Sequence, residues 1–110
     1  MATFDERQKG FEQKYKHDKE LEFKVNARRN KLLGLWAAQE LGLPASEAEA
    51  YAKTVVMADF AKPGDQDVVD KIMADFKERG RELSENRLRK RMEELLAEAR
   101  QQVMSEVKSG

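Results

Sequence analysis

The chain has 110 residues, with 21 basic side chains, 21 acidic side chains and no cysteine. A chain of this length forms one domain. The formal net charge of zero argues against a dedicated nucleic-acid binder, because such proteins need surplus Lys and Arg to bind phosphates. A sequence without cysteine has no disulfides, thiolate catalysis or Cys-based metal sites. No apolar run reaches the roughly 18 residues of a membrane span, and the acidic start is unlike a signal peptide, so we expect a cytoplasmic protein without membrane insertion.

Strong helix formers dominate the sequence, and only two prolines and six glycines interrupt them. No segment alternates apolar and polar residues as a half-buried strand would. We therefore predict an all-α fold, a small antiparallel four-helix bundle with a weakly docked or mobile N-terminal helical arm. The chain is expected to be a single helical domain over residues 1–110, with the arm at 1–17 and the helical body at 18–110.

The first segment begins with a capping-box pattern, Thr3-Phe4-Asp5-Glu6. Phe4, Phe11 and Tyr15 are separated by seven and four residues, which places them on one face of a helix. The residues between them are charged, polar or glycine, so this apolar stripe is thin. We expect a marginal helix that is loosely docked or partly disordered in the isolated protein.

A second helical pattern covers residues 21–41 and ends at Gly42-Leu43-Pro44, where Gly42 suits a left-handed C-cap. Whether it continues the first segment through Asp18-Lys19-Glu20 is left open by the sequence. Within this helix, Trp36 is interpreted as a core anchor, and Gly34 as a position that lets a neighbouring helix approach closely.

The third helix is predicted to begin at a second capping box, Ser46-Glu47-Ala48-Glu49, and to end at the Pro63-Gly64 turn. Asp65 is expected to be the next N-cap. The Arg79-Gly80-Arg81 stretch kinks or ends the helix that follows, and Ser84 is a candidate cap for a fresh helix. The sequence leaves open whether that helix is continuous across Gly80.

Few residues are suited to catalysis. His17 is the only histidine and lies among charged neighbours, which favours a solvated side chain. Asp65, Asp67 and Asp70 invite a metal hypothesis, but they lack the spacing of a calcium loop, and helix capping accounts for Asp65 and Asp67. The phosphate-binding and nucleophile motifs are missing from the sequence, so we predict that the protein is not an enzyme.

Two basic runs, Arg28-Arg29-Asn30-Lys31 and Arg87-Leu88-Arg89-Lys90-Arg91, are interpreted as solvated helix faces with i,i+4 ion pairs. The turn at Glu40-Leu41-Gly42-Leu43-Pro44 resembles a helix-turn-helix corner. A helix-turn-helix-like nucleic-acid-binding module, or another small helical adaptor, is therefore the alternative function.

The N-terminal arm has two interpretations of about equal weight. Its spaced aromatic residues suit helix-in-groove binding, in which the arm folds on a partner. The arm could equally be an ordinary first helix of the bundle.

Several stretches closely resemble the bacterial ATP synthase zeta subunit family, also described as the ATPase inhibitor subunit zeta. The long stretch Arg28-Arg29-Asn30-Lys31-Leu32-Leu33-Gly34-Leu35-Trp36-Ala37-Ala38 is the most specific. The other matches are Thr3-Phe4-Asp5-Glu6-Arg7, Phe11-Glu12, Tyr15, Ala27, Glu47-Ala48-Glu49-Ala50-Tyr51-Ala52-Lys53, Val56, Ala58-Asp59-Phe60, Pro63-Gly64-Asp65 and Asp67-Val68.

The resemblance implies a four-helix protein that binds the catalytic head of the F-type ATP synthase, at its alpha, beta and gamma subunits, and blocks ATP hydrolysis. In that family the N-terminal segment inserts between catalytic subunits beside the central rotor stalk, and the helical body anchors it. The partner-binding residues implied here are Phe4, Asp5, Arg7, Phe11, Glu12, Lys14 and Tyr15.

The same resemblance implies a cytoplasmic location, peripheral at the inner membrane through the ATP synthase. Weak binding of ADP or ATP is a further property of the family. The sequence has no phosphate-binding loop, so we expect no resident cofactor and assign no cofactor-binding, metal-binding or catalytic residues.

Overall fold

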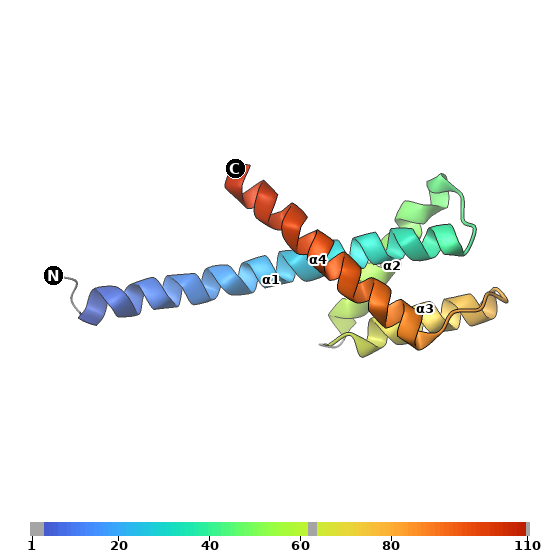
Figure 1. The fold of residues 1–110 in the computed structure, drawn as a ribbon, viewed down its shortest axis with the longest axis horizontal. Coiled ribbons are helices and arrows are strands. Elements are labelled where there is room, and N and C mark those ends of the chain that lie inside the picture. The colour runs from blue at the N-terminus through green and yellow to red at the C-terminus, as the bar shows by residue number, and fades with distance from the viewer. Residues whose placement is uncertain (1–3, 62–63, 110) are drawn as a thin grey trace.

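The computed structural model describes the backbone of residues 4–61 and 64–109, and the side chains of residues 19–59 and 64–107. Four helices make up the fold: α1 (Phe4–Glu40), α2 (Ala45–Ala61), α3 (Gln66–Glu78) and α4 (Glu85–Ser109) (Figure 1). The described backbone contains no strand. The predicted all-α, four-helix fold is confirmed.

Helix α1 is continuous through residues 18–20, which answers the question that the sequence left open. It ends as predicted at Gly42, whose φ of 77° is left-handed. The Leu41 amide donates to the Ala37 carbonyl (2.8 Å), and the Leu43 amide donates to the Ala38 carbonyl (2.9 Å). These two bonds satisfy carbonyl groups that the end of the helix would otherwise leave free.

The start of α2 differs from the prediction. The Pro44 carbonyl accepts hydrogen bonds from the amides of Glu47 (2.9 Å) and Ala48 (3.0 Å), and the helix begins at Ala45. Ser46 therefore lies inside the first turn, and the predicted capping box at this position is wrong. The physical reason is Pro44, whose ring fixes φ near the helical value and lets the chain enter the helix before Ser46.

The start of α4 follows the prediction. Helix α3 ends before Gly80, which has a left-handed φ of 69°, and the Arg81 amide donates to the Phe76 carbonyl (2.8 Å). The Ser84 hydroxyl then accepts a hydrogen bond from the Arg87 amide (3.1 Å) and caps α4. The chain is thus not helical across Gly80. The predicted Thr3 cap of α1 lies outside the described residues.

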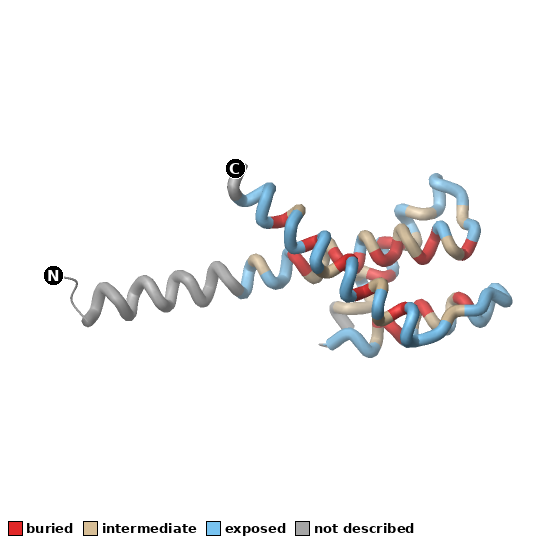
Figure 2. Tube along the Cα trace, viewed as in Figure 1, coloured by how far each residue is buried: buried red, intermediate tan, exposed pale blue. Residues whose placement is uncertain are grey.

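All four helices contribute to one main core (Figure 2). Its buried members are Leu33, Ala37, Leu41, Val55, Val68, Val69, Ile72, Phe76, Leu88, Met92 and Leu95. Trp36 packs against this core as predicted, with its ring stacked on Phe76 at a centroid distance of 6.4 Å. The guanidinium groups of Arg87 and Arg91 lie 5.9 and 5.5 Å from the Trp36 ring centre, within cation–π range.

The closest approach of α1 to α2 occurs at Gly34. A Cβ atom on this glycine would lie 2.5 Å from the Ala52 Cα and 2.9 Å from the Ala52 Cβ. Carbon atoms in van der Waals contact are about 3.5–4.0 Å apart, so only glycine fits between these two backbones. The predicted close approach at Gly34 is confirmed.

Candidate functional site

The predicted partner-binding residues belong to the first part of α1. The side chains of Phe4, Asp5, Arg7, Phe11, Glu12, Lys14 and Tyr15 lie outside the described residues, as does that of His17. Their assignment therefore stays a prediction. The structure does describe the part of the body that holds α1 immediately after the arm.

A small second core fixes α1 against the C-terminal half of α4, and we call it the α1–α4 clasp. Val25, Ala99 and Val103 are buried in it, and three partly buried leucines pack against them, Leu21, Leu32 and Leu96. Figure 1 shows α4 crossing α1 in this region. The clasp begins at Leu21, four residues after the predicted end of the arm.

Polar side chains next to the clasp also connect α1 to α4. One Arg28 Nη atom donates to the Gln102 side-chain oxygen (2.9 Å), and the other pairs with the Glu106 carboxylate (2.6 Å). Arg28 is part-buried and Glu106 is exposed, so this ion pair contributes modestly to stability and mainly orients α4 on α1.

A second polar connection, which we call the Arg29 bridge, joins α1 to the start of α3. Arg29 is only 3% exposed, and its Nη2 atom donates to the Asp65 carboxylate at 2.8 Å. The Nε and Nη2 atoms also donate to the Asn30 side-chain oxygen, at 3.1 and 2.8 Å. The interpretation of Arg28-Arg29-Asn30-Lys31 as a solvated face is therefore wrong at Arg29 and at Asn30, which is 1% exposed.

Asp65 occupies the N-cap position of α3, as predicted, but its side chain makes no capping hydrogen bond. The carboxylate turns instead to the Arg29 guanidinium. This hydrogen bond is the main reason that the pKa of Asp65 is lowered, and partial burial opposes it. The buried cation on α1 thus accounts for the Asp65 carboxylate, which the sequence had suggested as a cap or a metal ligand.

A polar cluster joins α2 to α3 through Tyr51, Lys71 and Asp75. The Tyr51 hydroxyl donates to Asp75 at 2.7 Å, and burial together with this bond raises the pKa of Tyr51 further above its ordinary value. Lys71 also pairs with Asp75, at 3.0 Å. Among the described residues, no group of three or more His, Asp or Glu side chains is placed to hold a metal ion.

The arginines of the second basic run pair with nearby carboxylates. Arg89 pairs with Glu85 at 3.3 Å with the predicted i,i+4 spacing, and Arg91 pairs with Glu94 at 3.0 Å with i,i+3 spacing. Arg87 lies 3.7 Å from Glu40. Each of these arginines has a carboxylate partner, which reduces the positive charge that the run offers to the phosphates of a nucleic acid, and Lys90 is exposed.

Comparison with known proteins identifies the family. A family model described as ATPase inhibitor subunit zeta matches residues 1–102. The chain belongs to the ATPase inhibitor subunit zeta family. The matched range begins at residue 1 and includes the predicted arm.

A solved structure agrees with this zeta fold. The chain is similar to a protein whose structure, determined by solution NMR, has 44% sequence identity and a TM-score of 0.69. The similarity covers 78% of the present chain and 98% of the other. No match was found among curated proteins.

Membership of the zeta family supports a role as an inhibitor that binds ATP synthase, and an inhibitor subunit points to a non-enzymatic role. No helix within the described part of the zeta chain is long and apolar enough to cross a membrane.

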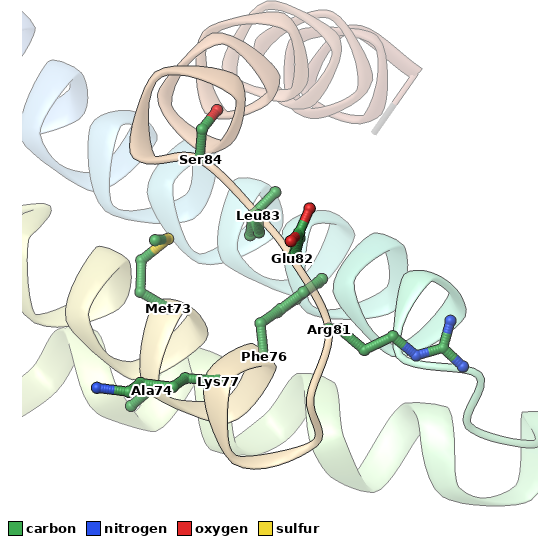
Figure 3. A pocket seen from close by; sticks show the side chains of 8 residues that line it. All are labelled: Met73, Ala74, Phe76, Lys77, Arg81, Glu82, Leu83 and Ser84. Atoms are coloured by element: carbon green, nitrogen blue, oxygen red, sulfur yellow. The ribbon is translucent and has the colours of Figure 1, made fainter.

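The zeta chain also has a hollow of about 560 Å³ beside the connection from α3 to α4. Met73, Phe76 and Leu83 give it an apolar lining, and the guanidinium of Arg81 points away from these three side chains (Figure 3). Lys77, Glu82 and Ser84 also line the hollow, and the Ser84 hydroxyl accepts a hydrogen bond from the Arg87 amide as the cap of α4.

The Arg29 bridge and the polar part of the clasp were not predicted from the sequence. Arg29 pairs with a residue 36 positions away and Arg28 with one 78 positions away. The only indication in the sequence is that the basic residues 28 and 29 lie next to a stretch with apolar helical spacing.

Proposed function

We propose that this protein is a regulatory subunit that binds the catalytic head of the F-type ATP synthase and blocks ATP hydrolysis. Its N-terminal segment, residues 1–17, inserts between catalytic subunits, and residues 18–110 form the body that holds this segment. The observation that carries the proposal is the match of residues 1–102 to the zeta family model.

The helical register of α1 supports a role for two of the three aromatic residues, Phe11 and Tyr15. Eighteen positions make five full turns of an α-helix, so Phe11 shares the angular position of Arg29, and Tyr15 shares that of Leu33. Arg29 and Leu33 are both buried in the body. The face of α1 that is buried at Arg29 and Leu33 thus continues into the arm at Phe11 and Tyr15. A partner that covers this face in the arm would bury it as the other helices do in the body.

The proposed roles follow from the side-chain chemistry. Phe4, Phe11 and Tyr15 are buried anchors, because large aromatic side chains contribute most of the binding free energy in many interfaces. The four charged residues pair with the walls of the cleft; they are Asp5, Arg7, Glu12 and Lys14. The clasp and the Arg29 bridge supply a fixed base from which α1 presents these groups.

Inhibition of this kind needs no chemistry from the inhibitor. A segment held between catalytic subunits prevents the conformational cycle that hydrolysis requires. The partners are the alpha, beta and gamma subunits, and the location is the cytoplasmic side of the inner membrane, reached through the ATP synthase. The protein is not itself an enzyme and carries no resident cofactor or metal.

The test is ATP hydrolysis by the cognate catalytic head, titrated with the full chain or with the double variant Phe4→Ala/Phe11→Ala. Loss of an anchor typically costs about 2 kcal/mol, or roughly 30-fold in affinity, so the double variant should need at least that much more protein for half-inhibition. A matched control is Met104→Ala/Val107→Ala, which removes two exposed apolar side chains from α4.

The two variants separate the outcomes. Inhibition that is weakened at the arm and retained in the α4 control supports the proposal. Equal inhibition by the arm variant and the natural chain would show that the body is the effector. If the natural chain neither binds nor inhibits, and binds duplex DNA with a steep salt dependence instead, the nucleic-acid alternative replaces the proposal.

A further inference from the structure

Two adjoining hollows form a trough across α1, and both are lined by Lys31 and Val56. One hollow, of about 370 Å³, lies between α1 and α2 and is also lined by Met57. The other, of about 430 Å³, reaches α4 at Val103 and is floored by Ala27 of α1. We call the combined surface the α1–α2–α4 trough.

The trough contains the two most exposed large apolar side chains described. Met57 is 64% exposed and Phe23 is 58% exposed. Single exposed apolar residues are common, but here they line one hollow surface together with Ala27, Val56 and Val103. An apolar surface that gathers on three helices in this way is typical of an interaction site.

The rim of the trough is positively charged, although the chain has no net charge. Lys24, Lys31, Lys53 and Arg28 contribute four positive charges against the two carboxylates of Glu49 and Glu106, a local excess of two. Glu106 already pairs with Arg28. Within the described part of the chain, the three lysines form no ion pair. Their charges remain available to a partner.

We propose that the trough binds a segment of the catalytic head that presents apolar side chains flanked by Asp or Glu. The proposal rests on the inhibitory function proposed above and adds the second surface by which the body is held. Charge complementarity indicates the chemistry of the partner. Its carboxylates would form ion pairs with the three lysines, and its apolar side chains would pack against Met57 and Val56.

The position of the trough on α1 supports the same partner. Phe23 follows Tyr15 by eight positions in one helix, which is about 12 Å along its axis. The clasp and the Arg29 bridge fix α1 in the body, so the arm and the trough would engage a single partner together. Two linked contacts raise the overall affinity, because binding of the first brings the second to a high effective concentration.

The experiment measures binding of the labelled full chain to the catalytic head, prepared without its own copy of the inhibitor, at low and at moderate salt. The trough variant is Lys31→Glu/Lys53→Glu, and Met57→Ser tests the apolar part separately. The matched control is Lys77→Glu/Lys90→Glu, which changes the net charge equally at two exposed lysines that do not line the trough.

We expect the trough variant to raise Kd about tenfold or more at low salt and to flatten its salt dependence, because rim charges act mainly through long-range attraction. The control should stay within about twofold of the natural chain. Met57→Ser should weaken binding with little change in salt dependence. At saturating concentration the trough variant should still inhibit hydrolysis, because its arm is intact.

Several results would overturn the trough proposal. One is that both trough variants bind the head with the same Kd as the natural chain. Another is that the control variant loses as much affinity as the trough variant. A third is a concentration-dependent dimer that the trough variant abolishes, because the occupant is then a second copy of this chain. If the arm variant loses inhibition while the trough variants bind normally, the proposed function stands and the trough fails. If the natural chain does not bind the head, the proposed function itself fails.

Discussion

Replacing Gly34 by alanine tests the close approach of α1 and α2. At an ordinary exposed position inside a helix, a change from glycine to alanine stabilises the protein by about 1 kcal/mol, because alanine has the higher helix propensity. At Gly34 the new Cβ would lie 2.5 Å from a backbone atom, the Ala52 Cα. The structure therefore predicts the opposite sign.

The magnitude follows from the geometry. Moving from 2.5 Å to a carbon–carbon contact of about 3.5 Å requires the two backbones to separate by roughly 1 Å. Overpacking of this kind costs about 1–3 kcal/mol, and the upper part of that range applies because the contacted atom belongs to the backbone. After the gain of about 1 kcal/mol in propensity, we expect a net destabilisation of about 1–2 kcal/mol.

Urea unfolding followed by circular dichroism measures this change. With an m-value of about 1.5 kcal/mol per M, the midpoint should fall by about 1 M without a change in slope. Ala50→Gly, at an exposed position of α2, calibrates the propensity effect and should cost about 1 kcal/mol. A midpoint for Gly34→Ala equal to or above that of the natural chain would refute the packing argument.

Three further predictions concern the body. Because the Arg29 hydrogen bond holds the pKa of Asp65 below its ordinary value, the stability that this pair contributes is present at neutral pH and is lost as the pH falls below about 4. Asp65→Asn should therefore reduce the fall in thermal stability between pH 5 and pH 3, and an unchanged fall would contradict the bridge. Leu33→Ala, at a fully buried position of the main core, should cost about 2–5 kcal/mol in urea unfolding, and a loss below 1 kcal/mol would contradict its central placement. Ser84→Ala should cost about 1 kcal/mol through loss of the hydrogen bond from the Arg87 amide, whereas no loss would show that water replaces the cap.

Local sequence patterns predicted most of the fold. The helices, the left-handed end at Gly42 and the cap at Ser84 depend on residues close together in the chain, so the sequence carries them directly. The start of α2 was misplaced because two local cues compete there. Pro44 sets the helix entry by its fixed φ, and the Ser46 pattern that would otherwise mark a cap falls inside the helix.

Features that depend on distant residues could not be predicted. Nothing near Arg29 in the sequence shows that Asp65 will meet it, and a run of basic residues ordinarily indicates a solvated face. The trough likewise exists only because α1, α2 and α4 cross at one place. The arm residues were named by spacing and by resemblance to the zeta family, and their roles stay predictions.

The two separate cores have a consequence for how the molecule opens. Among the residues whose side chains are described, the clasp buries Val25, Ala99 and Val103, whereas the main core joins all four helices. A small satellite cluster opens at a lower free energy than the global unfolding reaction. The amide hydrogens of α4 around Val103 should thus exchange with solvent sooner than those around Leu88. We therefore expect the end of α4 to open as a separate cooperative unit, and this unit packs against α1 at Leu21 and Val25, next to the predicted arm.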